Sequence, residues 1–404
     1  MTRSTSLIHH AYRAPTDFEA PQVAVHKAST VIFPNVAAMR TREWLDKSAY
    51  TYGLHGTPTT FTLEERLASL EGGTHCLLVP SGLAAIAHVN MALLKTGDAV
   101  LIPDNAYAPN KAFAEGELQR WGIAHQVYNP LDVSDLARKI TPQTRLVWLE
   151  AAGSVSMEFP DLIGLVRVCR DKGVLCVLDN TWGAGLAFNA FDLTPQDAGP
   201  PLGVDLTIHA LTKYPSGGGD VLMGSIVTRD DALAKQLKLS HMRLGTGVGA
   251  NDVELVLRSL PSMALRYQAQ DVAARALVQW CVQQNAFAQV LHPALPNAPG
   301  HAHWQQLCVT PAHPQGLAAG IFSVVMPEGC SGAQVDAFCD ALRLFKIGYS
   351  WGGPMSLVVP YHLQGSRALP TPHLPTKRLV RFCIGLESVE DLQQDISQAL
   401  AQLT

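Results

Sequence analysis

The fold of this chain is indicated first by residues 76–102, which read CLLVPSGLAAIAHVNMALLKTGDAVLI. Residues 76–79 are all apolar and predict a buried strand, residues 83–94 predict a helix, and residues 99–102 predict a second buried strand. Neither strand alternates polar with apolar side chains, so both faces of each strand should be covered by other elements. A strand, a helix and a further strand in this order are typical of a parallel sheet.

The same alternation continues towards the C-terminus. Further buried strands are predicted at residues 146–149, 174–178 and 204–211, and helices at residues 111–120 and 162–172. We therefore expect an α/β fold in which a mostly parallel sheet is flanked by helices on both faces. Such sheets bind ligands at the carboxyl ends of their strands, so polar residues at those ends are the first candidates for a functional site.

Three regions of different character follow from the sequence, because 404 residues are too many for one small core. Residues 1–60 show no sustained periodicity and predict an extended arm, whereas residues 61–250 contain the strand–helix alternation and predict a large domain. Residues 251–404 predict a smaller α+β domain, with helices at 262–284, at 334–345 and from 388, and strands at 321–326 and 379–384.

A helix is expected directly after the arm. Thr62, followed by Glu65, predicts a capping box at the start of this helix. Three leucines with helical spacing give it an apolar face, and Gly72 should end it.

Composition and charge exclude several classes of protein. Hydrophobic residues make up 47% of the chain and charged residues 16%, which suits a large and well-buried α/β protein. A formal net charge of -4 and a pI of about 6.4 give no basic surface of the kind that binds nucleic acid or anionic lipid. No apolar run is long enough to cross a bilayer, and the first residues lack the apolar core of a secretory signal, so we expect a cytoplasmic protein.

The cysteines and histidines indicate neither a disulfide framework nor a metal site. The eight cysteines form no CxxC pair and mostly have apolar neighbours, so reduced thiols in the core are expected. Two histidine pairs, His9-His10 and His301 with His303, lie in polar or proline-rich segments without the spacing of metal ligands. We assign no metal to this chain.

Lys213 is the first residue that suggests chemistry. It lies in the segment HALTKYPSGGGD at residues 209–220, between an apolar strand and a glycine-rich loop. A lysine at a strand end can extend its amine into solvent and have no further role. It can also be a partly desolvated amine that forms a Schiff base with a carbonyl compound. The segment by itself fits both interpretations.

Asp179 and the pair Ser81-Gly82 lie at the ends of two other predicted strands. An aspartate there can form a turn, or it can pair with a protonated pyridine nitrogen, as a pyridoxal cofactor requires. Ser81 can be an ordinary N-cap of the following helix. Alternatively, the free N–H groups of that helix can bind a phosphate, and Gly82 lets the backbone approach it closely.

Tyr107 and Arg381 complete the set of candidates. Tyr107 follows a strand and is either a loop aromatic or a platform for a ring. Arg381 lies within an apolar strand, so its guanidinium needs an anion, either an internal carboxylate or the carboxylate of a substrate. A phosphate seat, an aspartate and a lysine at strand ends, and an arginine in the second domain describe one coherent site.

The chain resembles the pyridoxal-phosphate enzymes of cysteine and methionine metabolism, which have fold type I. The resemblance lies in six segments that follow this order: YTYGLHGTPT, SGLAAI, LDNTWGAG, ALTKYPSGGGD, SWGG and VRFCIGLE. It covers nearly the whole chain from about residue 25 to residue 403. Within the family the chain is most similar to bacterial cystathionine β-lyases, through AYAPN around Tyr107, EAAGSVSME from Glu150, DNTWGAG with Trp182 and YSWGG with Trp351.

The resemblance implies a seven-stranded sheet and pyridoxal 5'-phosphate as the cofactor. It implies that Lys213 carries the cofactor, that Asp179 holds the pyridine nitrogen and that Tyr107 stacks on the ring. The other implied cofactor contacts are Gly82 and Leu83 through backbone N–H groups, Thr212 through its hydroxyl, Ser154, Thr181 and, from a neighbouring subunit, Tyr52.

Substrate contacts and assembly are implied in the same way. Arg381 should bind the substrate α-carboxylate, with help from Ser350 beside Trp351. A neighbour's Tyr52 in the site implies a homodimer that shares its active sites, usually paired into a tetramer. The resemblance implies a small amino acid as substrate and neither nucleic acid nor a membrane as partner.

Two positions depart from the family pattern. Leu54 stands where the family has an arginine that reaches the neighbour's phosphate, and losing that contact costs about 1.5–3 kcal/mol unless a group such as His55 replaces it. Gly218 and Gly219 stand where a GHSD-like sequence is expected, which predicts a more mobile loop.

The expected activity is β-elimination from L-cystathionine, which gives homocysteine, pyruvate and ammonia. Lys213 would remove the α-proton and protonate the leaving thiol, and Tyr107 would help to deprotonate the incoming amine. The alternatives are γ-elimination or γ-replacement, and cysteine desulfhydration or cysteine-conjugate lysis, all within the same family. A non-catalytic cofactor-binding regulator is a further alternative. A nicotinamide enzyme is a third, but this chain lacks the GxGxxG turn that such an enzyme has after its first strand.

Overall fold

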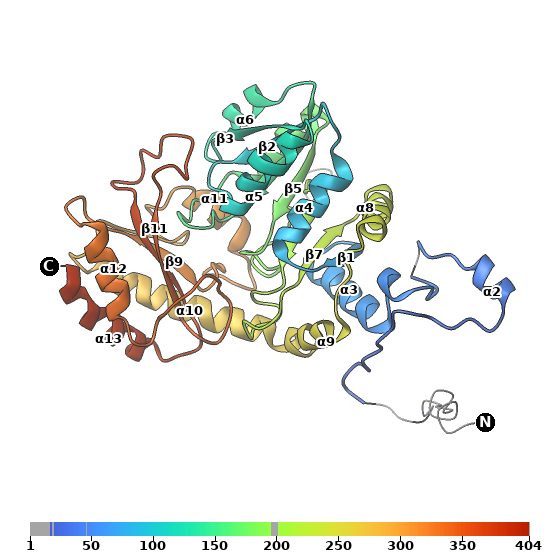
Figure 1. The fold of residues 1–404 in the computed structure, drawn as a ribbon. Coiled ribbons are helices and arrows are strands. Elements are labelled where there is room, and N and C mark those ends of the chain that lie inside the picture. The colour runs from blue at the N-terminus through green and yellow to red at the C-terminus, as the bar shows by residue number, and fades with distance from the viewer. Residues whose placement is uncertain (1–16, 18–19, 46, 195–200, 404) are drawn as a thin grey trace.

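The computed structural model describes residues 17, 20–45, 47–194 and 201–403, which contain two sheets (Figure 1). The first sheet has seven strands in the order β1 (His75–Val79), β7 (Gly224–Thr228), β6 (Leu206–Ala210), β5 (Leu175–Asp179), β4 (Thr144–Glu150), β2 (Ala99–Pro103) and β3 (Ala124–Tyr128). β7 is antiparallel to both of its neighbours, and the other adjacent pairs are parallel. The expected α/β fold with a mostly parallel seven-stranded sheet is confirmed.

Helices cover both faces of this sheet. One face packs against α4 (Gly82–Leu93), α5 (Ala108–Phe113) and α8 (Asp231–Leu244), and the other packs against α3 (Pro58–Glu71), α6 (Val133–Lys139) and α7 (Leu162–Lys172). The strands are apolar on both sides because alternate residues enter different cores. In β4, for example, Trp148 lies in the core under α4, whereas Val147 and Leu149 lie in the core under α7.

The start of α3 differs from the prediction. The helix begins at Pro58, and its capping box is formed by Thr57 and Thr60. The hydroxyl of Thr62 instead donates to the carbonyl of Pro58 within the first turn. The proline explains the earlier start, since its fixed φ suits the first position of a helix. The predicted end is confirmed, because Gly72 caps the helix with a φ of 79°.

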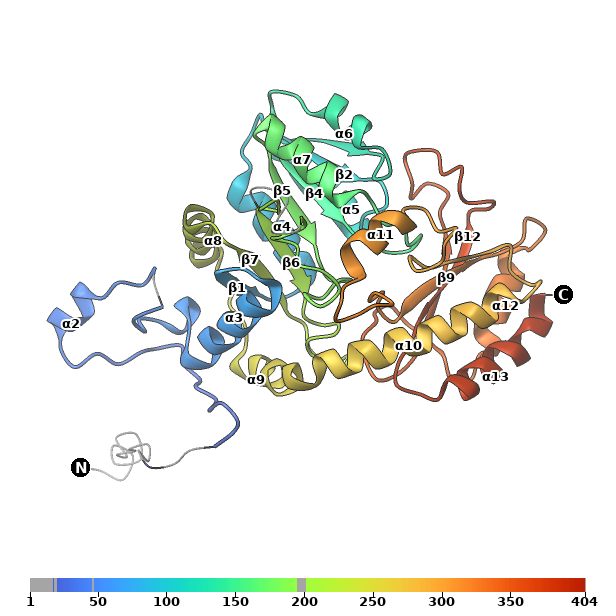
Figure 2. The same cartoon turned by 180° about the vertical axis from the view of Figure 1, so that it is seen from behind.

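The second sheet has five strands in the order β10 (Lys346–Ile347), β11 (Leu357–His362), β12 (Arg378–Cys383), β9 (Ile321–Val325) and β8 (Gln289–Leu291). It packs with α10 (Met263–Val282), α12 (Gly332–Ala341) and α13 (Val389–Ala399) around an aromatic core. In that core Phe382 stacks on Phe322 at 5.2 Å between ring centroids and meets Phe345 edge-on at 5.0 Å. Figure 2 shows α10 running from beside α9 (Ala250–Ser259) to this sheet.

Several elements were not predicted. The helix expected at residues 111–120 begins at Ala108 and changes at Ala114 into a short π-helix, η2 (Ala114–Leu118). The elements without a counterpart in the prediction are β3, β7, β8, β10, β11, α6, α8, α9 and α11 (His301–Cys308), and the short turns η1 (Gly53–His55) and η4 (Leu260–Ser262). The helix predicted from residue 388 ends as an α-helix at Ala399 and continues as the 3-10 turn η5 (Leu400–Leu403). The boundaries 1–60, 61–250 and 251–404 remain a prediction.

The described part of residues 1–60 extends away from the body of the molecule (Figure 1). The helix α2 (Val36–Thr41), which lies wholly within this segment, has no buried residue. The apolar side chains of the segment include Ile32, which is 85% exposed. Val36, Met39 and Tyr52 are also about half exposed, and several exposed apolar side chains on one segment are typical of an interaction surface. The arm therefore suits the predicted contact with a neighbouring subunit.

All eight cysteines are buried and free, as their apolar neighbours predicted. In the described ranges no three histidine, cysteine or acidic side chains come together as metal ligands would, and His9-His10 lie outside these ranges. Each helix in the described part of the chain is too short or too polar to span a bilayer.

Candidate active site

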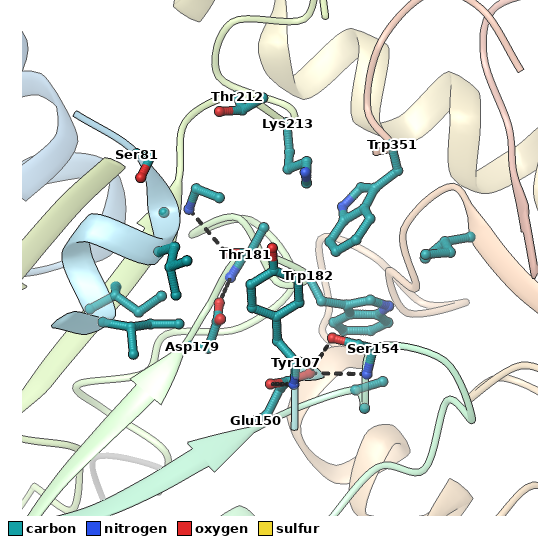
Figure 3. A pocket seen from close by; sticks show the side chains of 18 of the residues that line it. Ser81, Tyr107, Glu150, Ser154, Asp179, Thr181, Trp182, Thr212, Lys213 and Trp351 are labelled. Atoms are coloured by element: carbon teal, nitrogen blue, oxygen red, sulfur yellow. Dashed lines mark hydrogen bonds between the residues drawn. The ribbon is translucent and has the colours of Figure 1, made fainter. Parts of the chain in front are cut away.

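A cavity opens at the carboxyl ends of β4, β5 and β6, and most of the predicted site residues line it (Figure 3). They are Gly82, Leu83, Tyr107, Ser154, Asp179, Thr181, Thr212, Lys213 and Trp351. Ser350 and Arg381 do not line the cavity but contact residues that do. Tyr52 lies elsewhere in the same chain.

Lys213 lies in the turn that follows β6. Its Nζ donates a hydrogen bond to Oγ of Ser350 at 3.1 Å and lies 4.8 Å from the ring centroid of Trp351. Burial of the amine and the positive charge of Arg381 lower the pKa of Lys213. A lower pKa leaves more of the amine in its neutral form, which is the form that attacks a carbonyl.

Asp179 and Glu150 end two adjacent parallel strands, where they are partners in register and both line the cavity. Oδ1 of Asp179 accepts a hydrogen bond from the N–H of Thr181 at 3.1 Å. Burial raises the pKa of the Asp179 carboxyl. Burial, together with the charge of Asp179, raises the pKa of Glu150 to about 8.

Sequence reasoning gave Glu150 no role. Its Oε2 accepts from the N–H of Tyr107 at 2.8 Å, and its Oε1 accepts from the N–H and the hydroxyl of Ser154 at 3.0 and 2.6 Å. The available signal was the same one that identified Asp179, namely an acid that directly ends an apolar strand. Trp182 and Met157 also line the cavity without having been predicted as site residues.

The first turn of α4 faces the cavity with its N–H groups. Ser81 caps the helix, with its Oγ accepting from the N–H of Ala84 at 3.0 Å. The N–H groups of Gly82 and Leu83 have no acceptor within the helix. A Cβ on Gly82 would lie 2.6 Å from Cβ of Ala210, so glycine allows α4 to approach the end of β6 this closely.

Thr181 connects the ends of two strands below the cavity. Its N–H donates to Asp179 at the end of β5, and its Oγ1 accepts from the N–H of Ala210 at the end of β6 at 3.0 Å. The next residue, Trp182, is buried, and its Nε1 has no partner in the described part of the chain.

Tyr107 directly precedes α5, and Glu150 fixes its backbone. Its ring crosses the cavity in Figure 3, with the hydroxyl on the side that faces Lys213. Burial and the nearby charges of Asp179 and Glu150 raise the pKa of this hydroxyl, which therefore stays protonated at neutral pH.

Arg381 lies in β12 of the second sheet and is only 4% exposed. Its Nη1 donates to the carbonyl of Ser154 at 3.0 Å, and its guanidinium lies 5.3 Å from the ring of Trp351 and 5.1 Å from the ring of Tyr361. Its Nε is buried without a partner, and no carboxylate among the described residues forms an ion pair with it. A buried cation in this state favours an anion supplied from outside.

The arm residues do not reach the cavity of their own chain. Tyr52 is 45% exposed and forms an isolated bridge with Thr30. Leu54 and His55 line a second cavity against α8, where Nδ1 of His55 lies 2.8 Å from Oγ1 of Thr51. The predicted contribution of Tyr52 to a neighbour's site, and the replacement of the missing arginine, remain predictions.

Two glycines of the loop after Lys213 adopt left-handed backbone conformations. Gly217 and Gly219 have φ values of 64° and 73°, which are positive angles that favour glycine. A side chain on Gly217 would overlap the guanidinium of Arg266, which donates to the carbonyl of Tyr214 at 2.9 Å. The first part of the loop is therefore packed, and the predicted mobility of the loop stays a prediction.

Comparison with known proteins defines the class of enzyme. The model of the family described as "Cys/Met metabolism PLP-dependent enzyme" matches residues 4–401. The chain therefore belongs to this family of pyridoxal-phosphate-dependent enzymes.

Individual relatives carry more specific names. The chain is 37% identical over 378 residues to a putative cystathionine beta-lyase from Rhizobium johnstonii, covering 93% of this chain and 89% of that protein. It is 35% identical to a cystathionine beta-lyase from Bordetella avium, covering 98% and 96%. It is also 33% identical to an L-alanine/L-glutamate racemase from Wolbachia pipientis, covering 88% and 83%.

Solved structures with the same fold include family members with other names. The crystal structure of metB from Corynebacterium glutamicum matches with a TM-score of 0.84 at 25% identity, covering 99% of this chain and 98% of that chain. A cystathionine gamma synthase from Xanthomonas oryzae in complex with cystathionine matches with a TM-score of 0.82 at 28% identity, covering 96% and 95%.

The cavity residues fit the cofactor of this family. Pyridoxal phosphate needs an amine for its aldehyde, a carboxylate for its ring nitrogen and donors for its phosphate. The cavity provides the amine of Lys213, the carboxyl of Asp179, the free N–H groups at the start of α4 and the hydroxyl of Thr212. The close approach that Gly82 allows is the cradle that a phosphate requires.

Proposed function

We propose that this protein is a carbon–sulfur β-lyase that cleaves L-cystathionine to homocysteine, pyruvate and ammonia. One observation carries the proposal. The amine of Lys213, with its lowered pKa, and the guanidinium of Arg381, which has no carboxylate partner in the described residues, lie against the same Trp351 ring at 4.8 and 5.3 Å. The cystathionine beta-lyase names of several relatives support this activity over others in the family.

In this proposal the cavity residues hold the cofactor and the substrate. Lys213 carries the cofactor, Asp179 pairs with its ring nitrogen, and Thr212 binds the phosphate together with the first N–H groups of α4. Ser154 and Thr181 also contact the cofactor. Their hydrogen bonds hold the carboxyl groups of Glu150 and Asp179, respectively, in position. When bound, the cofactor supplies an electron sink that stabilises negative charge on Cα of the substrate.

Lys213 moves the protons of the reaction. When the cofactor holds the substrate, Nζ of Lys213 would be free to act as a neutral base. Nζ removes the proton from Cα, the Cβ–S bond breaks, and the leaving sulfur takes a proton from Nζ. The lowered pKa of Lys213 suits both steps, because the amine must accept and release a proton near neutral pH.

Arg381 orients the substrate through its α-carboxylate. Trp351 and Tyr361 lie against the guanidinium and exclude water from it, which strengthens the ion pair. Ser350 assists by binding the amine of Lys213 beside Trp351.

Tyr107 acts as a platform for the cofactor ring in this proposal. Its raised pKa makes the hydroxyl a poor base in the free site, so we assign the ring contact to it in preference to deprotonation of the incoming amine.

Product analysis tests the proposal. Purified enzyme is incubated with L-cystathionine, L-cysteine and L-alanine, and pyruvate, 2-oxobutyrate and D-alanine are each quantified. The proposal requires pyruvate and homocysteine from L-cystathionine as the main products. The Lys213→Ala variant should lose both pyruvate formation and the visible absorption of the bound cofactor.

Other members of the family would give other products. If 2-oxobutyrate replaced pyruvate, the enzyme would be a γ-lyase, and faster turnover of L-cysteine would indicate a desulfhydrase. D-alanine as the main product would indicate a racemase, as one relative is named. Absence of turnover with all three amino acids would favour a non-catalytic role.

We also propose a homodimer that shares its active sites and pairs into a tetramer. The exposed apolar residues of the arm support a contact with another subunit. Light scattering at several concentrations should give a mass of two or four chains of 43.5 kDa, and a monomer would contradict this assembly.

A further inference from the structure

Glu150 receives three hydrogen bonds on one buried carboxyl group, and these bonds connect it to two different sides of the cavity. Oε2 holds the backbone of Tyr107, at the start of α5. Oε1 holds the N–H and hydroxyl of Ser154, in the turn after β4. We propose that Glu150 is a positioning residue that fixes Tyr107 and Arg381 relative to each other.

The connection to Arg381 runs through Ser154. Ser154 uses its N–H and its hydroxyl for Glu150 and its carbonyl for Nη1 of Arg381 at 3.0 Å. The carbonyl of Ser154 accepts from Nη1 of Arg381, whereas Nε of Arg381 is unpartnered among the described residues. The orientation of the guanidinium therefore depends on where the carbonyl of Ser154 lies, and Glu150 determines that position.

The connection to Tyr107 is direct. Backbone atoms cannot relax as a side chain can, so the 2.8 Å bond from the N–H of Tyr107 fixes where its ring enters the cavity. Tyr107 otherwise lies at the first turn of α5 without a side-chain cap. One carboxyl thus sets the place of an aromatic ring on one side and of a cation on the other.

The protonation state of the Glu150 carboxyl depends on the charged groups around it. Asp179 faces it in register from β5, and Tyr107 and Ser154 bond to it from the segments before α5 and after β4. Lys213 and His209 lie near Asp179, and Arg381 contacts the carbonyl of Ser154. Asp179 disfavours a second negative charge, so Glu150 and Asp179 compete for one proton.

This competition gives the proposal a pH signature. Burial and the charge of Asp179 raise the pKa of Glu150 to about 8, so binding that depends on its contacts should change across that pH. If Glu150 only filled space, its replacement would leave the pH dependence of ligand binding unaltered.

The inference rests on the proposed function only for the carboxylate-binding role of Arg381, and the test uses a probe that needs no elimination. L-Alanine has a carboxylate and an amine but no leaving group on Cβ. Its apparent dissociation constant is measured from the change in visible absorption of the cofactor-loaded enzyme, from pH 6.5 to pH 9.5. Ethylamine, which lacks the carboxylate, serves as the matched probe.

Glu150→Gln is the main variant, because its amide must turn an N–H group towards the N–H of either Tyr107 or Ser154, where the carboxylate has an acceptor. Above pH 8, where the carboxyl is ionised, we expect about tenfold weaker binding of L-alanine, since a charge-assisted hydrogen bond contributes more than 1.4 kcal/mol. Ethylamine binding should change less than about twofold, and the change with pH near 8 should disappear.

Two further variants make the result decisive. Ser154→Ala removes the 2.6 Å bond alone and should weaken L-alanine binding in the same direction but less, which covers the case in which Glu150→Gln fails to fold. Glu64→Gln removes another buried carboxylate, paired with Lys47 at 2.8 Å outside this cavity, and should leave L-alanine binding unchanged. Wild-type affinity and pH dependence in both Glu150→Gln and Ser154→Ala would overturn the inference, whether or not cystathionine is the substrate.

Discussion

The amine of Lys213 and the hydroxyl of Ser350 lie 3.1 Å apart, and their hydrogen bond connects the first sheet to the second. Lys213 follows β6, whereas Ser350 lies between β10 and β11. Ser350 has a φ of 146°, an angle that residues other than glycine seldom adopt. A serine retained in such a conformation, with its hydroxyl on the lysine, indicates a functional reason for the position.

Ser350→Ala should reduce catalysis without releasing the cofactor. The substitution removes the hydrogen bond that orients Nζ of Lys213, which is worth about 0.5–1.5 kcal/mol for a neutral donor. We expect kcat/KM for L-cystathionine to fall by up to about tenfold while the visible absorption of the bound cofactor persists. Ser331→Ala, which removes a helix cap on α12 at the surface, is the matched control and should leave kcat/KM unchanged. An unaltered kcat/KM in Ser350→Ala would show that Trp351 and the turn orient the amine without the serine.

Gly82→Ala should weaken cofactor binding. The added Cβ would lie 2.6 Å from Cβ of Ala210, so the N-terminus of α4 must move away from the end of β6. The free N–H groups of that turn would then lie too far from a phosphate, and we expect the dissociation constant of pyridoxal phosphate to rise about tenfold or more. Equilibrium dialysis of the apo-protein measures it. Gly116→Ala, with no atom within 4 Å of the added Cβ, should bind the cofactor as the wild type does.

The gathering of the candidate residues at one cavity was predictable where a polar residue follows an apolar strand. Lys213 and Asp179 each end an apolar strand, and parallel strands bring such ends together. Glu150 shows the limit of this reasoning. It carries the same signal as Asp179, but its importance depends on bonds to Tyr107 and Ser154 that only the folded chain reveals.

The fold was predictable to a similar extent. Strands buried on both faces, such as β4 and β5, are recognisable from their continuous apolar residues. β3 lies at the edge of the first sheet and alternates exposed with partly buried residues, so its sequence AHQVY gives no clear signal. The capping box at Thr57 was missed because its partner is Thr60, not the glutamate that the usual pattern contains.

Leu54→Arg should tighten cofactor binding if the arm reaches a neighbouring subunit. In the described chain Leu54 lies far from the first cavity and lines the second, so an arginine here can reach a phosphate only in another subunit. A charge-assisted contact of about 1.5–3 kcal/mol would lower the dissociation constant of pyridoxal phosphate at least tenfold. The gain should shrink as salt is added. His55→Arg is the control at the adjacent position, and equal effects of both variants would point to a general charge effect.

Glu158→Gln should destabilise the protein through a buried network that connects the two sheets. Glu158 is completely buried and accepts from Nε2 of His373 at 2.9 Å and from Nη1 of Arg367 at 3.1 Å. Nε of Arg367 also donates to Asp104 at 2.8 Å, three residues before Tyr107. Removing one partner of a buried ion pair costs about 3–5 kcal/mol. The exposed pair of Glu117 with Arg120 supplies the control, since Glu117→Gln should change stability by about 0.5 kcal/mol or less.

The pH dependence identifies the charge of Glu158 as the cause. Burial alone would raise its pKa, but the hydrogen bond from His373 and the charge of Arg367 lower it from 4.5 to about 2. A carboxyl with a lowered pKa stabilises the folded state above its unfolded pKa, and this stability is lost as the pH falls from 4.5 through about 2. The difference in unfolding midpoint between wild type and Glu158→Gln should therefore be constant above pH 5 and shrink below pH 4.5. A difference that stayed the same in acid would mean that the lost stability comes from packing and not from the carboxylate charge.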